Sequence, residues 1–241
     1  MWKDKTISVV LPCYNEEENV RNAITDFFNC GCVDEVLAVN NNSTDNTAQE
    51  IKKANAVLIN EEKQGYGFAI QRGLKEAKCD YIIISEPDGT FSANDIYRLL
   101  VYAEEFDMVL GTRTSKTCIW EGANMGHFLK WGNWVVAKML EFLFNGPSLT
   151  DVGCTMRLIE KKALGKIIGK FTVGGSHFLP EMTILAILNG LKVVEIPLNY
   201  MPRVGKSKIT GRKVRAFKVG LRMMMLILRY KLKSLFKGRL R

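Results

Sequence analysis

The amino-acid sequence predicts an α/β protein in which helices flank a mostly parallel central sheet. Short apolar runs rich in β-branched residues alternate with segments of helical periodicity over residues 1–111. The apolar runs are continuous, which is typical of strands that are buried on both faces of a parallel sheet. A chain of 241 residues is long enough for one such domain with an appendage.

The first half of the chain supplies most of the expected sheet. Its strands are predicted at residues 6–11, 35–39, 56–59, 81–85 and 108–111. Helices are predicted between them at residues 17–28, 44–53, 66–77 and 93–104. The second half is less regular: an aromatic-rich stretch at 118–145 precedes an expected strand at 154–159, a helix near 180–189 and a strand at 192–200.

Basic residues are concentrated at the C-terminal end. Fourteen of the 34 Lys and Arg residues lie in residues 201–241, which contain no Asp or Glu. The preceding 200 residues therefore hold 20 basic and 25 acidic residues, and this body is mildly acidic. A basic tail of this kind is expected to bind something anionic, either phosphate-rich lipid or nucleic acid.

Residues 213–237 are predicted to form an amphipathic helix with an apolar stripe and a separate basic stripe. Burying a charge at the centre of a bilayer costs roughly 2.5–3.5 kcal/mol, whereas a basic residue beside anionic lipid contributes about 1 kcal/mol. We therefore expect a domain at residues 1–211 and a tail at 212–241 that lies on an anionic membrane surface, joined by Trp120, Trp131 and Trp134. The alternative is a helix that packs on the domain or on a partner.

The sequence also indicates a location. It contains no run of about 20 uncharged apolar residues, so no transmembrane helix is expected. The N-terminal apolar stretch is too short for a signal peptide. The six cysteines lack paired CxxC spacing and do not resemble a secreted disulfide framework. We expect a cytoplasmic protein, peripheral on the inner face of the membrane.

Polar loops follow three of the predicted strands. They contain Pro12, Tyr14 and Glu16, then Asn40 and Asn42, then Glu86 and Asp88. Ligands of parallel sheets bind at the carboxyl ends of the strands, where these loops meet. An aromatic ring with amide groups suits a nucleobase and ribose, and two carboxylates at i and i+2 can hold a hard divalent cation against a diphosphate. Taken singly, each loop has an alternative role in capping the next helix.

The glycines at positions 65 and 67 do not complete a dinucleotide-binding fingerprint, because Ile70 stands where the third glycine is required. We expect Gly65 to permit a tight turn or the close approach of a ligand.

Motifs in a fixed order extend over nearly the whole chain. They read VVLPCYNEEENV, VNNNSTDNT, GYGFAIQRGL, SEPDGTF, GTR at 111–113, TDVGCTMRLI and EIPLNYMPRVGKSKITG. In this order they resemble family 2 glycosyltransferases with the Rossmann-like GT-A fold, above all dolichol-phosphate mannosyltransferases and polyprenyl-phosphate sugar transferases. The resemblance implies an inverting enzyme that moves a sugar from a UDP- or GDP-linked donor to a polyprenyl or dolichyl phosphate.

The resemblance also implies roles for single residues. Pro12, Tyr14 and Glu16 would grip the nucleotide, and Glu86 and Asp88 would hold Mg²⁺ or Mn²⁺ beside the diphosphate. Asp88 and Asp151 are the expected catalytic residues. The remaining residues expected to bind substrate are Asn40, Asn42, Gly65, Arg113, Arg157, Arg203, Lys206 and Lys208.

Two departures from the family pattern bear on these roles. The chain has Asn40, Asn41 and Asn42 where the family usually reads Asp-Asp-Gly, and an amide donates hydrogen bonds that a carboxylate cannot. Glu86 replaces the first Asp of the metal-binding pair and reaches one methylene further, and Thr90 replaces a family glutamine. The resemblance therefore does not predict which nucleobase the donor carries. Part of the metal coordination is expected through water molecules.

The acceptor decides whether a general base is required. A lipid phosphate is already ionised, whereas a hydroxyl needs a base within hydrogen-bonding reach, for which Asp151, His177 and Glu181 are the candidates. Transfer to a glycan or glycolipid hydroxyl, an inactive relative, and a nucleic-acid-binding protein are the alternative functions. The acidic body and the lack of RNA-binding motifs argue against the last, so no nucleic-acid partner is expected.

Overall fold

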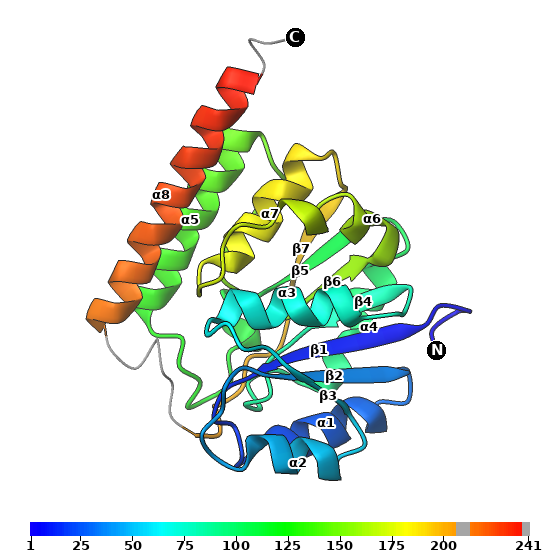
Figure 1. The fold of residues 1–241 in the computed structure, drawn as a ribbon. Coiled ribbons are helices and arrows are strands. Elements are labelled where there is room, and N and C mark those ends of the chain that lie inside the picture. The colour runs from blue at the N-terminus through cyan, green and yellow to red at the C-terminus, as the bar shows by residue number, and fades with distance from the viewer. Residues whose placement is uncertain (206–212, 238–241) are drawn as a thin grey trace.

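The computed structural model describes residues 1–205 and 213–237, within which a seven-stranded sheet lies between two layers of helices (Figure 1). The strands are β1 (Ile7–Cys13), β2 (Glu35–Asn40), β3 (Val57–Asn60), β4 (Tyr81–Ile84), β5 (Met108–Thr112), β6 (Arg157–Glu160) and β7 (Val193–Pro197). The α-helices are α1 (Val20–Asn29), α2 (Thr47–Lys53), α3 (Tyr66–Glu76), α4 (Ile96–Tyr102), α5 (His127–Phe144), α6 (Lys161–Gly165), α7 (Phe178–Leu188) and α8 (Lys213–Lys237). Short 3₁₀ segments are η1 (Ala93–Asp95), η2 (Lys116–Cys118) and η3 (Ile168–Lys170).

The described strands follow the order β3-β2-β1-β4-β6-β5-β7. Pairing is parallel except for β6, which is antiparallel to both β4 and β5. This arrangement confirms the predicted mostly parallel sheet. The chain leaves β1 towards β2 on one side and returns to β4 on the other, and ligands bind at such a reversal of strand order.

The two faces of the sheet carry separate cores. Along β1, Val10 points to the layer formed by α3 and α5 to α8, whereas Ile7, Val9 and Leu11 point to the layer that contains α1 and α4. Successive side chains of a strand point to opposite faces, and all seven residues of β1 are buried. The continuous apolar runs of the sequence follow from this burial on both sides.

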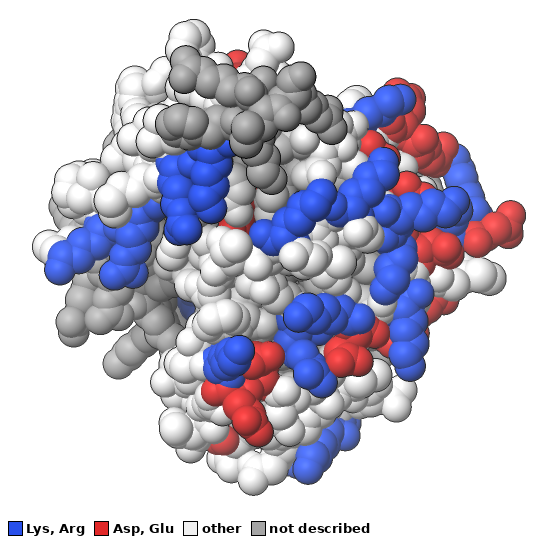
Figure 2. All heavy atoms as spheres, turned by 45° about the horizontal axis from the view of Figure 1, so that its top comes forward, with Lys and Arg blue, Asp and Glu red and all other residues white. Residues whose placement is uncertain are grey.

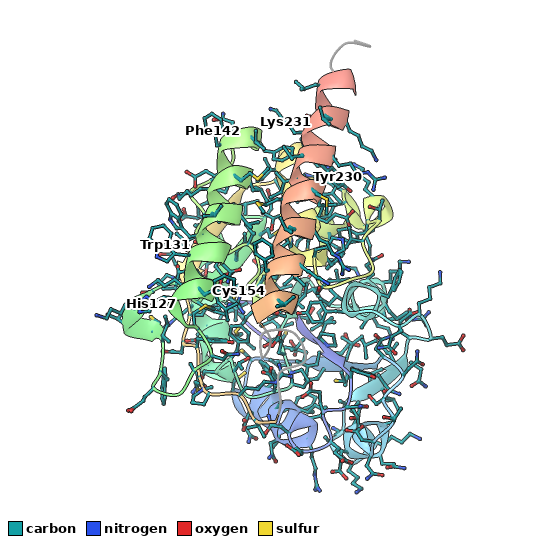
Figure 3. All side chains as sticks on the ribbon, turned by 90° about the vertical axis from the view of Figure 1, so that its left-hand side faces the viewer. His127, Trp131, Phe142, Cys154, Tyr230 and Lys231 are labelled. Carbon is teal, nitrogen blue, oxygen red and sulfur yellow. The ribbon has the colours of Figure 1, made fainter. Side chains whose placement is uncertain are left out.

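Helices α5 and α8 run side by side in the same direction at one end of the molecule (Figures 1 and 3). The inner face of α8 buries Met223, Leu226 and Ile227 in the core. Near its C-terminal end, Tyr230 donates a 2.7 Å hydrogen bond to Glu181, and Lys231 donates a 2.6 Å bond to the carbonyl of Leu143. One face of the predicted tail helix therefore packs on the body of the protein.

Helix α5 was expected only as an aromatic-rich stretch. It ends at Asn145, whose left-handed backbone (φ 49°) terminates the helix. The boundary predicted between 211 and 212 lies outside the described residues, so the division into domain and tail stays a prediction. In the described ranges 1–205 and 213–237, no helix has both the length and the apolar character that crossing a membrane requires.

Candidate active site

A cavity of about 740 Å³ opens beside the carboxyl ends of β1 and β4 and continues along α5 and α8. One side of it is polar and is formed by the loops that follow β1, β2 and β4, together with Tyr66, Arg113, Thr155, Tyr200 and Arg203. The other side is mainly apolar and is formed by the N-terminal halves of α5 and α8. The cavity therefore joins a polar compartment to an apolar one.

The loop after β1 is attached to the loop after β2 by direct hydrogen bonds. The backbone of Asn15 has a left-handed φ of 52°, and its side chain accepts a 2.8 Å bond from the N–H of Thr44. This turn leaves Pro12, Tyr14 and Glu16 lining the cavity. The structure thus brings these three predicted nucleotide-binding residues together with the loop after β2.

Asn41 is the residue of the second loop that lines the cavity. Its side chain is 2% exposed, and its amide nitrogen donates to the carbonyls of Glu61 at 2.9 Å and Lys63 at 2.8 Å. Its amide oxygen accepts from the N–H of Gly65 at 2.8 Å. A carboxylate supplies neither of the two donated bonds, so the asparagine at this position is explained by the course of residues 61–65.

Asn40 and Asn42 were expected to bind substrate, but neither lines the cavity. The amide of Asn40 donates to Asn60 at 3.1 Å and accepts from the N–H of Ser43 at 3.1 Å. The amide of Asn42 donates to the carbonyl of Glu62 at 2.6 Å. Both side chains hold loops together, so the structure does not bring them to the cavity, and their predicted contact with substrate stays a prediction.

The glycines around Tyr66 serve a close contact between backbones. A Cβ atom at Gly65 would lie 2.3 Å from the carbonyl oxygen of Gly174, and one at Gly67 would lie 2.5 Å from that of Val173. Gly65 itself does not line the cavity, whereas Tyr66 does. The expected role of Gly65 in ligand approach is therefore replaced by one in placing the first turn of α3 against residues 173–174.

Glu86 and Asp88 lie together at the end of β4, separated by Pro87 in a turn that Gly89 completes with a left-handed φ of 77°. Asp88 is 1% exposed, and its Oδ1 accepts two bonds from Thr90, from the N–H at 3.0 Å and from the hydroxyl at 2.6 Å. Burial, and then the negative charge of Asp88, raise the pKa of Glu86 to about 8. Asp88 is buried and Glu86 is half-buried, so a positive charge beside them would stabilise both groups as carboxylates.

This donor set fits the Mg²⁺ or Mn²⁺ that the sequence implies. Asp88 Oδ2 is buried and has the guanidinium of Arg203 as its charged neighbour, and carboxylate oxygens are the ligands that hard divalent cations prefer. Among residues 1–205 and 213–237, no three His, Cys, Asp or Glu side chains are grouped to hold a metal ion. Glu86 and Asp88 would therefore share the ion with diphosphate oxygens and water, which is usual for Mg²⁺.

Arg203 already places a positive charge in this compartment. Its guanidinium lies 2.9 Å from Asp88 Oδ2 and donates a 2.9 Å bond to Glu16. Burial alone would lower the pKa of Arg203, but the charges of Asp88 and Glu16 raise it, so it stays a cation. The structure brings Arg203 to the predicted site, whereas Lys206 and Lys208 lie outside the described residues.

Arg113 and Asp151 form a buried bidentate ion pair. Arg113 donates from Nε to Oδ2 at 2.8 Å and from Nη2 to Oδ1 at 3.0 Å, and its guanidinium lies 5.4 Å from the ring centre of Tyr200. Arg113 lines the cavity, but Asp151 is fully buried behind it. Both oxygens of Asp151 bind Arg113, so its side chain is placed to orient the arginine, and its catalytic role stays a prediction.

Three other predicted residues lie away from the cavity. Arg157 is fully buried and donates to the carbonyls of Leu179 at 3.1 Å and Cys154 at 2.5 Å, so the structure places it in the core, and its contact with substrate stays a prediction. Glu181 is also buried and accepts bonds from Thr172, Val173 and Tyr230, which excludes it as a base facing the acceptor. His177 does not line the cavity, and burial and the charge of Arg222 lower its pKa.

The apolar wall of the cavity and several polar residues were not anticipated. Tyr66 and Thr155 contact Glu86, and Tyr200 stacks on Arg113. The aromatic residues of 118–145 were the one signal for the wall, which Phe128 and Trp131 help to form. A single sequence gives no spacing rule that joins residues 66 and 155, because tertiary packing alone brings them together.

The chain is similar to known glycosyltransferases over most of its length. Residues 8–168 match the family described as Glycosyl transferase family 2. An uncharacterized glycosyltransferase of Mycobacterium tuberculosis is 30% identical over 210 residues, which cover 85% of this chain and 90% of the relative. A dolichyl-phosphate hexose transferase of Haloferax volcanii is 25% identical over 205 residues, covering 84% of this chain and 86% of the relative.

Solved structures share the fold at lower identity. Mannosyl-3-phosphoglycerate synthase from Rubrobacter xylanophilus superposes with a TM-score of 0.74 at 15% identity, covering 98% of this chain and 75% of that one. Glucosyl-3-phosphoglycerate synthase from Mycobacterium tuberculosis, crystallised with Mn²⁺ and UDP, gives a TM-score of 0.68 at 16% identity, covering 95% and 80%. These likenesses confirm the predicted fold.

Proposed function

The chain belongs to glycosyl transferase family 2, and from this membership we propose that it moves a sugar, with inversion, from a UDP- or GDP-linked donor to a polyprenyl or dolichyl phosphate at a membrane surface. Glycosyl transfer as such follows from the family. The donor base, the lipid acceptor, the metal and the place of action are the proposal.

The apolar side of the cavity is the observation that carries the lipid acceptor. It begins beside the compartment of Glu86 and Asp88 and follows side chains such as Phe128, Val136 and Met224 between α5 and α8. A phosphoglycerate acceptor has no apolar part to bury there, whereas a prenyl chain gains about 25 cal/mol per Å² of apolar surface removed from water. The named Haloferax relative supports the same class of acceptor.

The outer surface of the same two helices supports action at a membrane. On α5, Phe142 is 86% exposed and lies on the outer side of the helix in Figure 3, and Trp131, which also lines the cavity, is 63% exposed. On α8, Met225, Leu228 and Leu232 are exposed as well. Contiguous apolar surface of this kind, with aromatic residues, is typical of proteins that lie in a bilayer interface.

Charge on this part of the molecule favours an anionic surface. Figure 2 shows Lys and Arg side chains beside uncharged surface at the left of the view, and further Lys and Arg side chains across the middle and right, where Asp and Glu lie among them. Arg222, Arg229 and Lys233 are exposed on α8. Basic residues near anionic lipid contribute about 1 kcal/mol each, so the helix pair is suited to the inner face of a membrane.

The residues of the polar compartment have separate tasks towards the donor. Tyr14 and Pro12 offer an aromatic and an apolar surface to a nucleobase, and Gln64, whose amide nitrogen donates to Asn41, offers its amide oxygen beside it. Glu86 and Asp88 would hold Mg²⁺ or Mn²⁺, which neutralises the charge of the departing diphosphate. Arg203 adds a fixed positive charge next to the same position.

Arg113 is the residue suited to the acceptor phosphate. Asp151 holds its Nε and Nη2, so the guanidinium is fixed in orientation before the acceptor arrives. A phosphate oxygen of the acceptor is already ionised and attacks the sugar carbon without losing a proton. This accounts for a cavity in which Asp151 and Glu181 are both turned away from the substrate.

The experiment that tests this function compares acceptors under one donor screen. Purified full-length protein is incubated with UDP- or GDP-linked sugars, Mn²⁺ and one acceptor, and released nucleoside diphosphate is measured together with sugar in an organic extract. We expect both signals with a dolichyl or polyprenyl phosphate and neither with 3-phosphoglycerate or a glycan. Release that requires phosphoglycerate or a glycan instead would overturn the lipid acceptor, and Asp88→Asn supplies the inactive background.

A further inference from the structure

Two hydroxyl groups contact the same oxygen of Glu86. Thr155 Oγ1 lies 2.7 Å from Glu86 Oε1, and Tyr66 OH lies 3.3 Å from it. The two hydroxyls are themselves 2.6 Å apart. Three groups from distant parts of the chain therefore meet at one carboxylate oxygen: the end of β4, the first residue of α3, and the segment before β6.

Each hydroxyl has one hydrogen to donate, which determines the order of the contacts. The short distances run from Tyr66 to Thr155 and from Thr155 to Glu86, so the chain of donation is Tyr66 to Thr155 to Glu86. Hydrogen bonds in such a series polarise one another and strengthen the last one. Thr155 thus binds the carboxylate directly, and Tyr66 acts through Thr155.

Both hydroxyls are held in place by the fold. Thr155 is 1% exposed, and Tyr66 is fixed by the contact of its glycine neighbours with residues 173–174, where the N–H of Gly67 donates a 2.9 Å bond to Gly174. A glutamate has one more rotatable bond than an aspartate, and fixing a long side chain costs conformational entropy. A pair of preset hydroxyls removes that freedom from Glu86 before any ligand binds.

We propose that Tyr66 and Thr155 are positioning residues that fix Oε1 of Glu86 and so direct its other oxygen towards the divalent cation. This inference rests on the proposed function, because it requires that Glu86 and Asp88 hold the ion. It also explains how a glutamate serves at this position: the added methylene is accommodated by hydroxyl donors from α3 and from the segment before β6.

The experiment measures Mn²⁺ binding directly, in the presence of UDP and without turnover, from the electron paramagnetic resonance signal of free Mn²⁺. We expect Thr155→Val to weaken Mn²⁺ binding about tenfold, because a hydrogen bond to a charged group contributes about 1.5 kcal/mol or more. Tyr66→Phe should weaken it less, about threefold, because it removes the outer bond of the series. Thr155→Ser keeps the hydroxyl group and should bind Mn²⁺ as tightly as the unchanged protein does.

Matched controls separate positioning from general damage. Tyr102→Phe alters an exposed tyrosine of α4, and Thr117→Val alters an exposed threonine; both should bind Mn²⁺ as the unchanged protein does. If Thr155→Val does not fold, weaker Mn²⁺ binding by Tyr66→Phe together with unchanged Mn²⁺ binding by Thr155→Ser still tests the inference. Unchanged Mn²⁺ affinity in the folded Thr155→Val and Tyr66→Phe proteins would overturn the inference and leave the proposed function standing. No Mn²⁺ binding by the unchanged protein with UDP or GDP would overturn the metal assignment itself.

Discussion

Arg203 Nη1 lies 2.9 Å from Oδ2 of Asp88, a carboxylate that is 1% exposed. In the protein without metal, the charge that balances Asp88 therefore comes from the segment after β7. A divalent cation held by Glu86 and Asp88 would add a second positive charge at this carboxylate, and Arg203 would then no longer balance Asp88 alone. Stability and metal binding are consequently linked through Arg203.

Replacing Arg203 with Gln should destabilise the metal-free protein more than the metal-loaded one. Removing one partner of a buried pair costs about 3–5 kcal/mol, and we expect about 1–3 kcal/mol here because Arg203 is partly exposed to solvent. Urea unfolding with and without Mn²⁺ and UDP measures the difference. Arg72→Gln, which breaks an exposed pair with Glu76, is the control. An equal loss in both conditions would show that Arg203 and the ion do not share Asp88.

Asp151→Asn should act on the acceptor through Arg113. The bidentate pair loses its charge, so we expect a loss of about 3 kcal/mol in unfolding free energy and a higher KM for the lipid phosphate. Because Asp151 faces Arg113 and not the acceptor, the shape of the pH–rate profile should not change. Kinetics across pH on the folded variant measure this.

Glu195→Gln provides the comparison for Asp151→Asn. Glu195 accepts bonds from the backbone of Thr150 and Asp151 but does not contact Arg113. It should lower stability while leaving the KM for the acceptor unchanged. Loss of one limb of the pH profile in Asp151→Asn, with normal stability, would instead identify Asp151 as a general base.

The polar edge of the sheet was predictable because strand ends and their loops are close in sequence. Continuous apolar runs locate β1, β2 and β4, and parallel pairing then brings Tyr14, Asn41 and Asp88 to one cavity. Which amide of the second loop faces that cavity was not predictable. It depends on the bonds that Asn41 makes with residues 61–65, which are distant in sequence.

Helix α5 was not recognised because its apolar residues lie on every side. Val136 and Leu140 face the core, while Trp131 and Phe142 face outward, so no single stripe recurs at helical spacing. The buried position of Arg157 was not predictable for a related reason. Its guanidinium is satisfied by backbone carbonyls, which no sequence pattern distinguishes from the phosphates of a substrate.

Cys30 should react with alkylating agents at an unusually low pH. Its Sγ lies 3.5 Å from that of Cys32, and a hydrogen bond from Cys32 lowers the pKa of Cys30 to about 6 against the opposing effect of burial. A lowered pKa means that the thiolate is present above about pH 6, whereas an ordinary thiol ionises near 8.5. The rate of iodoacetamide labelling at Cys30, measured by mass spectrometry across pH, should rise with a midpoint near 6. Cys32→Ala removes the donor and should move the midpoint upward; an unmoved midpoint would show that Cys32 is not the cause.

The outer surface of α5 and α8 should carry membrane binding. Trp131→Ser with Phe142→Ser removes two exposed apolar side chains, each worth about 1.5–3 kcal/mol when buried. We expect at least a tenfold loss of partition into liposomes that contain anionic lipid, measured by flotation. Val101→Ser, an exposed apolar residue of α4 in the opposite layer, is the control. Equal flotation of both variants would place membrane contact elsewhere.

Filling the apolar side of the cavity should block the lipid acceptor and spare the donor. Gly220 of α8 lines the cavity, and a Cβ atom added to it meets nothing within 4 Å. Gly220→Leu therefore places a branched side chain in the space expected for the prenyl chain, and it favours the helix by about 1 kcal/mol rather than weakening it.

We expect the KM for a long prenyl phosphate to rise about tenfold or more, because the apolar contact of several methylene groups is lost. UDP- or GDP-sugar affinity, measured by calorimetry, should not change, since Gly220 belongs to the apolar side of the cavity and Tyr14 to the polar side. Gly165→Leu in α6 is the matched control: its Cβ position is also open, but it does not line the cavity. A Gly220→Leu protein that uses the long lipid as well as the Gly165→Leu protein does would mean that the acceptor takes another route to Arg113.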